Sequence, residues 1–164
     1  MFNEGDTVVY PQHGAGVIEK REVRRVLGEE REYLVIRVLH SDLTLSVPAD
    51  AAADAGLRPV MDDEGVERLV AVLTGEGGDE AQETFNRRFR ANREKLKTGD
   101  VLELAGVIRD LAHRDAEKGL STGERQMLGQ AKRVLASELR FVRGTDEDEA
   151  LEWLDAVLAR PPVG

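Results

Sequence analysis

The chain has 164 residues but no cysteine, only three histidines and only seven aromatic residues. Without a thiol it can form no disulfide, no cysteine-based zinc site and no thiol nucleophile. The histidines, His13, His40 and His113, are too widely separated to show the spacing of metal ligands. We therefore expect neither a metal nor any other cofactor.

Long apolar segments are missing as well. The clearest apolar runs are short, such as Val70–Leu73, whereas a helix needs roughly 20 apolar residues to span a bilayer. The first residues, Met1–Asp6, show no basic segment followed by an apolar one, which would mark a secretory signal. These absences predict a cytoplasmic protein that makes no contact with membranes.

Positive charge is in short supply over the whole chain. The 23 lysines and arginines face 32 acidic residues, which gives a net charge of -9, and nucleic-acid phosphates repel such a chain. Residues 85–143 are different, because their 14 basic and 8 acidic residues give a net charge of +6. A cationic block inside an anionic chain indicates an anionic partner.

The first third of the chain is patterned as strands. Thr7–Tyr10, Val17–Val26, Tyr33–Leu39 and Leu43–Pro48 are rich in β-branched and aromatic residues, and turn residues separate them. Four or five short strands in about 60 residues are typical of a small, strongly bent antiparallel β-barrel.

From about residue 61 the apolar period becomes helical. Asp100 is placed to cap one helix, and Ser121 with Glu124 forms a capping box, in which Ser121 binds the Glu124 amide and the Glu124 side chain returns to Ser121. We therefore predict an α+β fold with a β-domain over residues 1–55, a linker over 56–62 and an all-α helical bundle over 63–164.

One predicted helix carries most of the cationic signal, since Phe85–Lys97 holds six basic residues in thirteen. At about 100° per residue, the apolar positions of this helix share one arc, and Arg87, Arg90 and Lys97 lie opposite, with Arg93 beside them. Three cations in this arrangement can contact phosphates together. The alternative is a solvated basic face that only balances the acidic segments.

Phe85 has two interpretations. Its helical phase places it in the core, but it stands at the very start of its helix, after a glycine-rich stretch. An aromatic residue exposed there, beside arginines, can wedge against a base step in the minor groove.

No catalytic motif is present. Gly14–Glu19 lacks the third glycine of a dinucleotide fingerprint, and no serine and histidine fall in a triad-like pattern. We expect no enzymatic activity, since an enzyme would need a titratable pair in a pocket.

Several segments carry a family resemblance. Gly5–Gly14 reads GDTVVYPQHG, Glu32–Val35 reads EYLV, and Asn86–Asn92 reads NRRFRAN, followed later by GLS at Gly119–Ser121. In this order, over nearly the whole chain, they resemble the CarD/CdnL family of bacterial transcription regulators that bind RNA polymerase. The resemblance implies a Tudor-like domain over residues 1–55 that binds the polymerase β subunit. It also implies helices that contact promoter DNA at the upstream edge of the transcription bubble and stabilise the open promoter complex.

The resemblance extends to individual residues of the polymerase-binding surface. The family's β-subunit contact includes an arginine and a neighbouring apolar residue on the second strand, which match Arg24 and Val26. A second arginine of that surface is matched by Ser46, which has no charge. The resemblance therefore implies a β-subunit contact with one charged donor fewer.

DNA-contacting residues can be carried over in the same way. The family's wedge is typically a tryptophan, which is matched by Phe85, a side chain that keeps a flat apolar face but lacks the indole N–H. Arg87, Arg88 and Arg90 match the family's basic DNA-facing run, and Arg125 is a further candidate.

These observations together predict a monomer that binds the RNA polymerase β subunit and touches promoter DNA weakly, through phosphates and the minor groove. Docking on polymerase places the basic helix near DNA at a high effective concentration, so weak contacts suffice. The alternative is a protein–protein scaffold that uses the same barrel to bind another protein and has no role at DNA.

Overall fold

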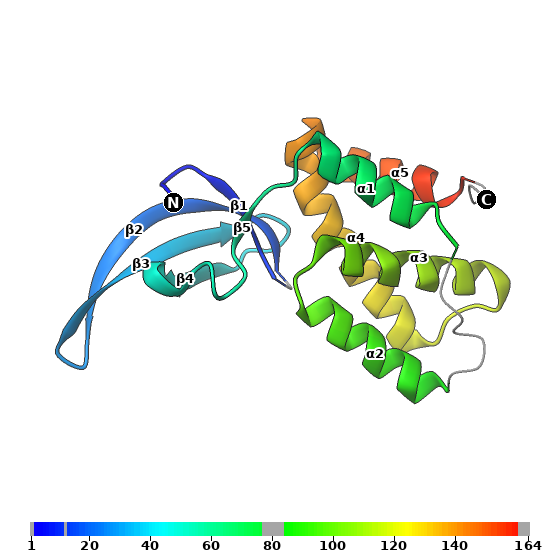
Figure 1. Ribbon diagram of the computed structural model, residues 1–164, viewed down its shortest axis with the longest axis horizontal. Coiled ribbons are helices and arrows are strands. Elements are labelled where there is room, and N and C mark those ends of the chain that lie inside the picture. The colour runs from blue at the N-terminus through cyan, green and yellow to red at the C-terminus, as the bar shows by residue number, and fades with distance from the viewer. Residues whose placement is uncertain (1, 12, 77–83, 161–164) are drawn as a thin grey trace.

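The computed structural model describes residues 2–11, 13–76 and 84–160. A curved antiparallel sheet forms one half of the molecule, and helices form the other (Figure 1). This arrangement confirms the predicted α+β class, with the strands in the N-terminal part of the chain and the helices after them.

The sheet has the strand order β4-β3-β2-β1-β5. Its strands are β1 (Thr7–Tyr10), β2 (Gly14–Val26), β3 (Glu29–Val38), β4 (Thr44–Pro48) and β5 (Arg58–Pro59). A register shift between Ile18 and Lys20 marks a bulge in β2, and bulges increase the bend and twist of a strand. Since β5 has two residues and pairs only with β1, the described sheet stays open between β4 and β5.

The core of the β-domain consists mainly of Val8, Ile18, Leu34, Ile36, Val47, Ala52 and Leu57, with the 3-10 turn η1 (Ala49–Ala51) beside it.

Part of the segment expected to link the domains belongs to the sheet. Leu57 is buried in the β-domain core, and β5 pairs with Val8 and Val9 of β1. The crossing to the helices is therefore confined to residues 60–62, where the Asp62 carboxylate accepts a hydrogen bond from the Gly65 amide at 2.8 Å and caps the first helix.

The helices are α1 (Asp63–Leu73), α2 (Phe85–Lys97), α3 (Val101–Glu117), α4 (Thr122–Arg143) and α5 (Glu147–Leu158). The cap residues predicted for α3 and α4 are confirmed, because Asp100 accepts from the Leu102 amide at 2.7 Å and Ser121 Oγ from the Glu124 amide at 3.2 Å. The Glu124 carboxylate also returns to Ser121, whose hydroxyl donates to it at 3.3 Å. No helix in the described ranges is long and apolar enough to cross a membrane.

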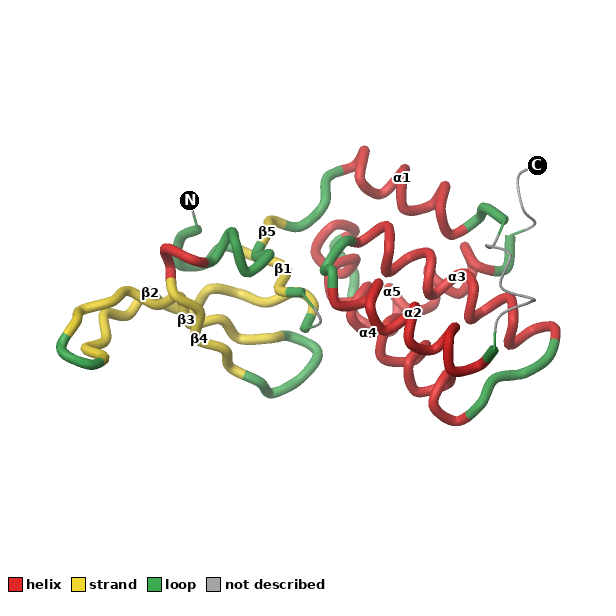
Figure 2. Tube along the Cα trace, turned by 60° about the horizontal axis from the view of Figure 1, so that its bottom comes forward, coloured by secondary structure: helices red, strands yellow, loops and turns green. Residues whose placement is uncertain are grey.

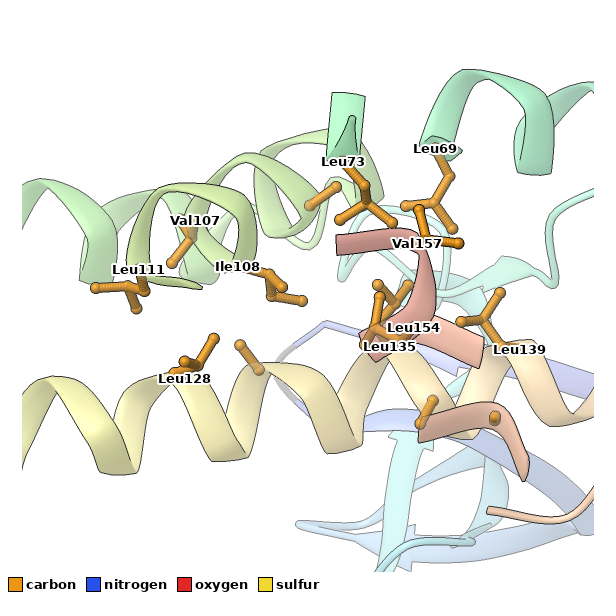
Figure 3. Close-up of a cluster of buried hydrophobic side chains, with 14 of the residues drawn as sticks. Leu69, Leu73, Val107, Ile108, Leu111, Leu128, Leu135, Leu139, Leu154 and Val157 are labelled. Atoms are coloured by element: carbon orange, nitrogen blue, oxygen red, sulfur yellow. The ribbon is translucent and has the colours of Figure 1, made fainter. Parts of the chain in front are cut away.

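The long helix α4 organises the helical core (Figures 2 and 3). Leucines along α4 meet apolar side chains of α3 and α5, and two leucines of α1 complete the cluster. The labelled members are Leu69, Leu73, Val107, Ile108, Leu111, Leu128, Leu135, Leu139, Leu154 and Val157. This packing supports α2, whose Leu96 is half-buried against the same cluster.

The turn between β1 and β2 rests on α4. The Ala15 amide donates to Ser137 Oγ at 2.9 Å, and this hydroxyl donates to the Val134 carbonyl at 2.6 Å. Gly14 has a φ of +86°, and a Cβ atom there would lie 2.5 Å from Ser137 Oγ. Glycine is therefore required at this position, both for its backbone conformation and for the close approach of the two domains.

A partly buried ion pair joins the domains at a second point. Arg58 Nη1 and Nη2 donate to the two carboxylate oxygens of Glu138 at 2.8 and 2.7 Å, and the Met61 amide donates to Glu138 Oε2 at 2.7 Å. Glu138 is 2% exposed. Because two parallel hydrogen bonds constrain both distance and direction, this pair holds the sheet and the helices in one orientation.

Candidate functional site

The β2–β3 hairpin projects from the sheet, away from the helices (Figures 1 and 2). At its turn, Leu27 is 99% exposed with a φ of +53°, and Val23 and Val26 are 64% and 45% exposed. Val23 faces the opposite side of β2 from Val26, so Val26 and Leu27 form the exposed apolar surface at the turn, and such surfaces are characteristic of protein-binding sites. The hairpin is therefore a candidate docking element.

Two of the predicted polymerase-binding residues meet on one face of this hairpin. Arg24 Nη2 donates to Ser46 Oγ at 3.1 Å, across from β2 to the edge strand β4. The same guanidinium binds Glu22 Oε2 at 2.8 Å and lies 5.2 Å from the Tyr33 ring centroid. The hydrogen bond from Arg24 is the main reason that the pKa of Glu22 is lowered. Val26 follows on the same face, since side chains alternate along a strand.

On the helical domain, α2 presents the predicted basic face. Thr84 caps the helix by accepting a hydrogen bond from the Arg87 amide at 3.3 Å. Arg87, Arg90 and Lys97 are all exposed, as their helical phase predicts. Lys97 pairs with the exposed Glu94 at 3.3 Å, an interaction that contributes little at a solvated surface. The three cations therefore remain accessible to an anionic partner.

Phe85 lies on the surface and not in the core, where its helical phase alone would place it. It is the first residue of α2 and is 42% exposed. Its ring stacks on Phe89 with centroids 5.5 Å apart and 24° between the ring planes, and the Arg88 guanidinium lies 5.8 Å from its centroid. Phe85 thus offers a flat apolar face that rests on a second ring and a cation.

Arg88 is placed differently from its predicted role. It is 3% exposed, and its Nε and Nη2 atoms donate to the Glu124 carboxylate at 3.0 and 3.4 Å. A guanidinium held in a buried ion pair cannot reach a phosphate without breaking that pair, so Arg88 does not belong to the exposed basic face. The signal was available in the helical phase, because Arg88 falls about 60° from Phe85 on the side of the buried Asn92.

The Glu124 carboxylate is held in its charged form. Burial raises the pKa of Glu124, but the hydrogen bond and charge of Arg88, together with a hydrogen bond from the Ser121 backbone, more than offset that effect. The pKa of Glu124 therefore lies below its ordinary value of 4.5. The pair stays ionised at neutral pH and ties α2 to the first turn of α4.

The same contact places Arg125 near the basic helix. A Cβ atom at Gly123 would lie 3.5 Å from the Phe89 ring, so the first turn of α4 packs directly on α2. Arg125 is exposed in this turn. The structure thus brings Phe85, Arg87, Arg90 and Arg125 to neighbouring parts of α2 and α4, with Lys97 at the far end of α2.

Sequence reasoning identified neither Arg58 nor Glu138 as important. Their only local signal is a glutamate on the apolar side of α4, next to Leu135 and Leu139 in a buried stretch. The partner lies 80 residues away, so no local pattern identifies it.

Comparisons with known proteins find matches to two family models along the chain. The family model described as CarD-like/TRCF RID domain matches residues 2–61, and the model described as CarD, C-terminal domain, matches residues 68–155. The chain is also 36% identical over 149 residues to the Bacillus subtilis (strain 168) protein named "Putative transcription factor YdeB". That similarity covers 91% of this chain and 97% of the relative.

Proposed function

Since the chain belongs to the CarD family, whose role lies in transcription, we propose that it docks on the β subunit of RNA polymerase and contacts promoter DNA. The contact falls at the upstream edge of the bubble and stabilises the open promoter complex. The observation that carries this proposal is the placement of two different surfaces on two domains that the Arg58–Glu138 ion pair joins. One surface is the hairpin face with Arg24, and the other is the end of α2 with Phe85.

Protein docking is supported by the form of the β-domain. Its edge strand β4 has one side without a partner strand in the described sheet, and a partner can add main-chain hydrogen bonds there. Arg24 and Ser46 lie beside this edge, and Val26 and Leu27 extend an apolar surface beyond it. The match to a polymerase-interaction type of domain over residues 2–61 points to RNA polymerase as the partner.

Weak DNA contacts are sufficient in this arrangement. A chain of charge -9 with a few exposed cations binds free DNA poorly. Once the chain is docked on polymerase, its helices and the promoter DNA belong to one complex, so the DNA contact becomes intramolecular. If the helices bind the opened promoter more tightly than the closed one, they shift the equilibrium towards the open complex. The shift equals the difference between the two binding free energies, about 1–3 kcal/mol.

The scaffold alternative makes a different prediction for α2. Reversing charge at Arg87 and Arg90 together should abolish open-complex stabilisation while polymerase binding is retained, because both side chains are exposed and lie outside the hairpin. The measurement is open-complex lifetime on a ribosomal-type promoter, with Arg68→Glu on α1 as the control. An unchanged lifetime in the double variant would favour the scaffold.

The surface ring of Phe85 should contribute separately. We expect Phe85→Ala to shorten the open-complex lifetime about fivefold, the change that 1 kcal/mol of lost aromatic contact produces. Phe141→Ala is the matched control, because Phe141 is a similarly exposed phenylalanine, 38% against 42%, on α4. Equal lifetimes for the two variants would assign Phe85 a packing role only.

Docking can be tested on adjacent arginines of β2. Arg24→Glu should weaken binding of the full chain to the isolated β subunit about tenfold or more, since reversing a charge at an interface both removes an attraction and adds a repulsion. Arg25→Glu changes the same charge on the opposite face of the strand and should have little effect. Binding that is insensitive to Arg24→Glu would place the docking surface elsewhere.

A further inference from the structure

A cavity of about 360 Å³ lies between the two domains, apart from the hairpin and from Phe85. The end of β1 and Pro11 line it on one side, and α2, α3 and α4 line it on the other. Its walls are mostly apolar and include Tyr10, Pro11, Leu96, Leu104 and Val134. Small-molecule sites commonly have this form, with volumes of roughly 300–1,000 Å³ and positions between domains.

The acidic groups that reach the cavity are already engaged. Asp100 accepts hydrogen bonds from the Leu102 and Glu103 amides at the start of α3, at 2.7 and 3.3 Å. Glu138 accepts two hydrogen bonds from Arg58 and one from the Met61 amide. Glu138 and Arg58 therefore compensate each other, whereas Asp100, whose bonds come from neutral amides, keeps its negative charge.

At the α2 side of the cavity, the charges of Arg93 and Lys97 remain to be considered. Arg93 lines the cavity, and within the described ranges no carboxylate lies at ion-pair distance from it. Its guanidinium lies 4.9 Å from the Phe89 ring centroid, which holds the side chain beside α2 without neutralising it. Lys97 adds a second cation, and its partner Glu94 is 66% exposed. With Arg58 and Glu138 paired, Arg93 and Lys97 face Asp100 alone, so the lining keeps one net positive charge, which favours an anion.

We propose that this interdomain cavity binds a small aromatic anion, with its charged group at Arg93 and its ring system against Leu96, Leu104 and Val134. Such a ligand contacts both domains at once. Because the ligand binds this orientation of the two domains preferentially, it stabilises that orientation. The inference holds whether or not the chain acts on polymerase.

The test uses naphthaleneacetate as the probe and the uncharged naphthaleneacetamide as its matched analogue. Titration of the full chain, followed by amide chemical shifts, should give saturable changes at Tyr10, Gly99 and Val134 with a Kd of about 1 mM or lower. The acid should bind about tenfold more tightly than the amide, because only the acid forms a charge-assisted contact. Arg93→Gln should abolish this preference, whereas Arg90→Gln, on the basic face outside the cavity, should keep it.

Three results of this titration would overturn the proposal. They are the lack of saturable shifts in the unmodified chain, equal affinity for the acid and the amide, and an unchanged preference in Arg93→Gln. Arg93 is a surface position, so its replacement leaves the fold intact. Val134→Phe, which reduces the free volume, should also abolish binding, and binding that persists in this variant would equally contradict the assignment.

Discussion

Arg58→Ala is expected to lower the free energy of unfolding by about 2–4 kcal/mol. The substitution removes two of the three donors to a carboxylate that is 2% exposed, and only the Met61 amide at 2.7 Å remains. A buried charge without its partner is costly, because the folded state cannot replace the water that solvates the charge in the unfolded state. Arg58 itself is 30% exposed, so water can reach the Glu138 carboxylate once the guanidinium is removed. The loss of stability should therefore be smaller than for a fully enclosed pair. Urea denaturation of the full chain measures the change.

A double-mutant cycle separates the buried charge from the loss of contacts. Adding Glu138→Leu to Arg58→Ala should recover part of the stability, since no unpaired charge is then left in the interior. Lys132→Ala is the control, because Lys132 pairs at 2.6 Å with Asp155, which is 60% exposed, and such a pair contributes about 1 kcal/mol at most. A loss in Arg58→Ala no larger than in the control would show that the interdomain pair does not hold the domains.

Glu124→Gln should have an effect of similar or larger size on the helical domain. Both partners of the Arg88–Glu124 pair are nearly inaccessible, with side chains 4% and 2% exposed. The amide keeps the shape of the side chain but removes the negative charge that faces the Arg88 guanidinium, and breaking such a buried pair costs about 3–5 kcal/mol. The measurement is again the free energy of unfolding, with Glu94→Gln as control, because Glu94 is an exposed glutamate whose partner, Lys97, is also exposed.

The pH dependence of stability identifies this pair independently. The pKa of Glu124 is lowered in the folded state from its ordinary value of 4.5, so the carboxylate contributes stability above that value and loses it as the pH falls through the folded pKa. Glu124→Gln has no such group. Between about pH 5 and pH 3 its stability should therefore fall less steeply than that of the unmodified chain. Parallel slopes would show that Arg88 does not hold the carboxylate ionised.

The same pair bears on the proposed DNA contact. Arg88 lies beneath the ring of Phe85, and Glu124 holds Arg88 in place. Phe85 is therefore presented on a supported surface, although it stands at the first position of its helix. Loss of Glu124 should shorten the open-complex lifetime as well as lower stability. Because its guanidinium is buried against Glu124, we expect Arg88 to act on the proposed site by positioning Phe85.

Local chemistry was enough to predict most of the fold. The cap residues Asp100 and Ser121 mark the starts of α3 and α4 because their side chains bond backbone amides two or three residues away. The exposure of Arg87 and Arg90 follows from helical phase alone, since the apolar positions of the same helix must face inward. Strand patterning likewise predicted the sheet, although the two-residue strand β5 has no pattern of its own and was placed in the linker.

What the amino-acid sequence by itself determined is the order of the main elements, the starts of α3 and α4 and the polarity of helix faces, because these depend on interactions within a few residues. Tertiary structure alone decided which charges meet. Arg88 finds Glu124 across 36 residues and Arg58 finds Glu138 across 80, and each encounter depends on how whole helices pack. It also decided that Phe85 is exposed, because helical phase gives a side chain its direction, whereas only the neighbouring elements determine whether anything covers it.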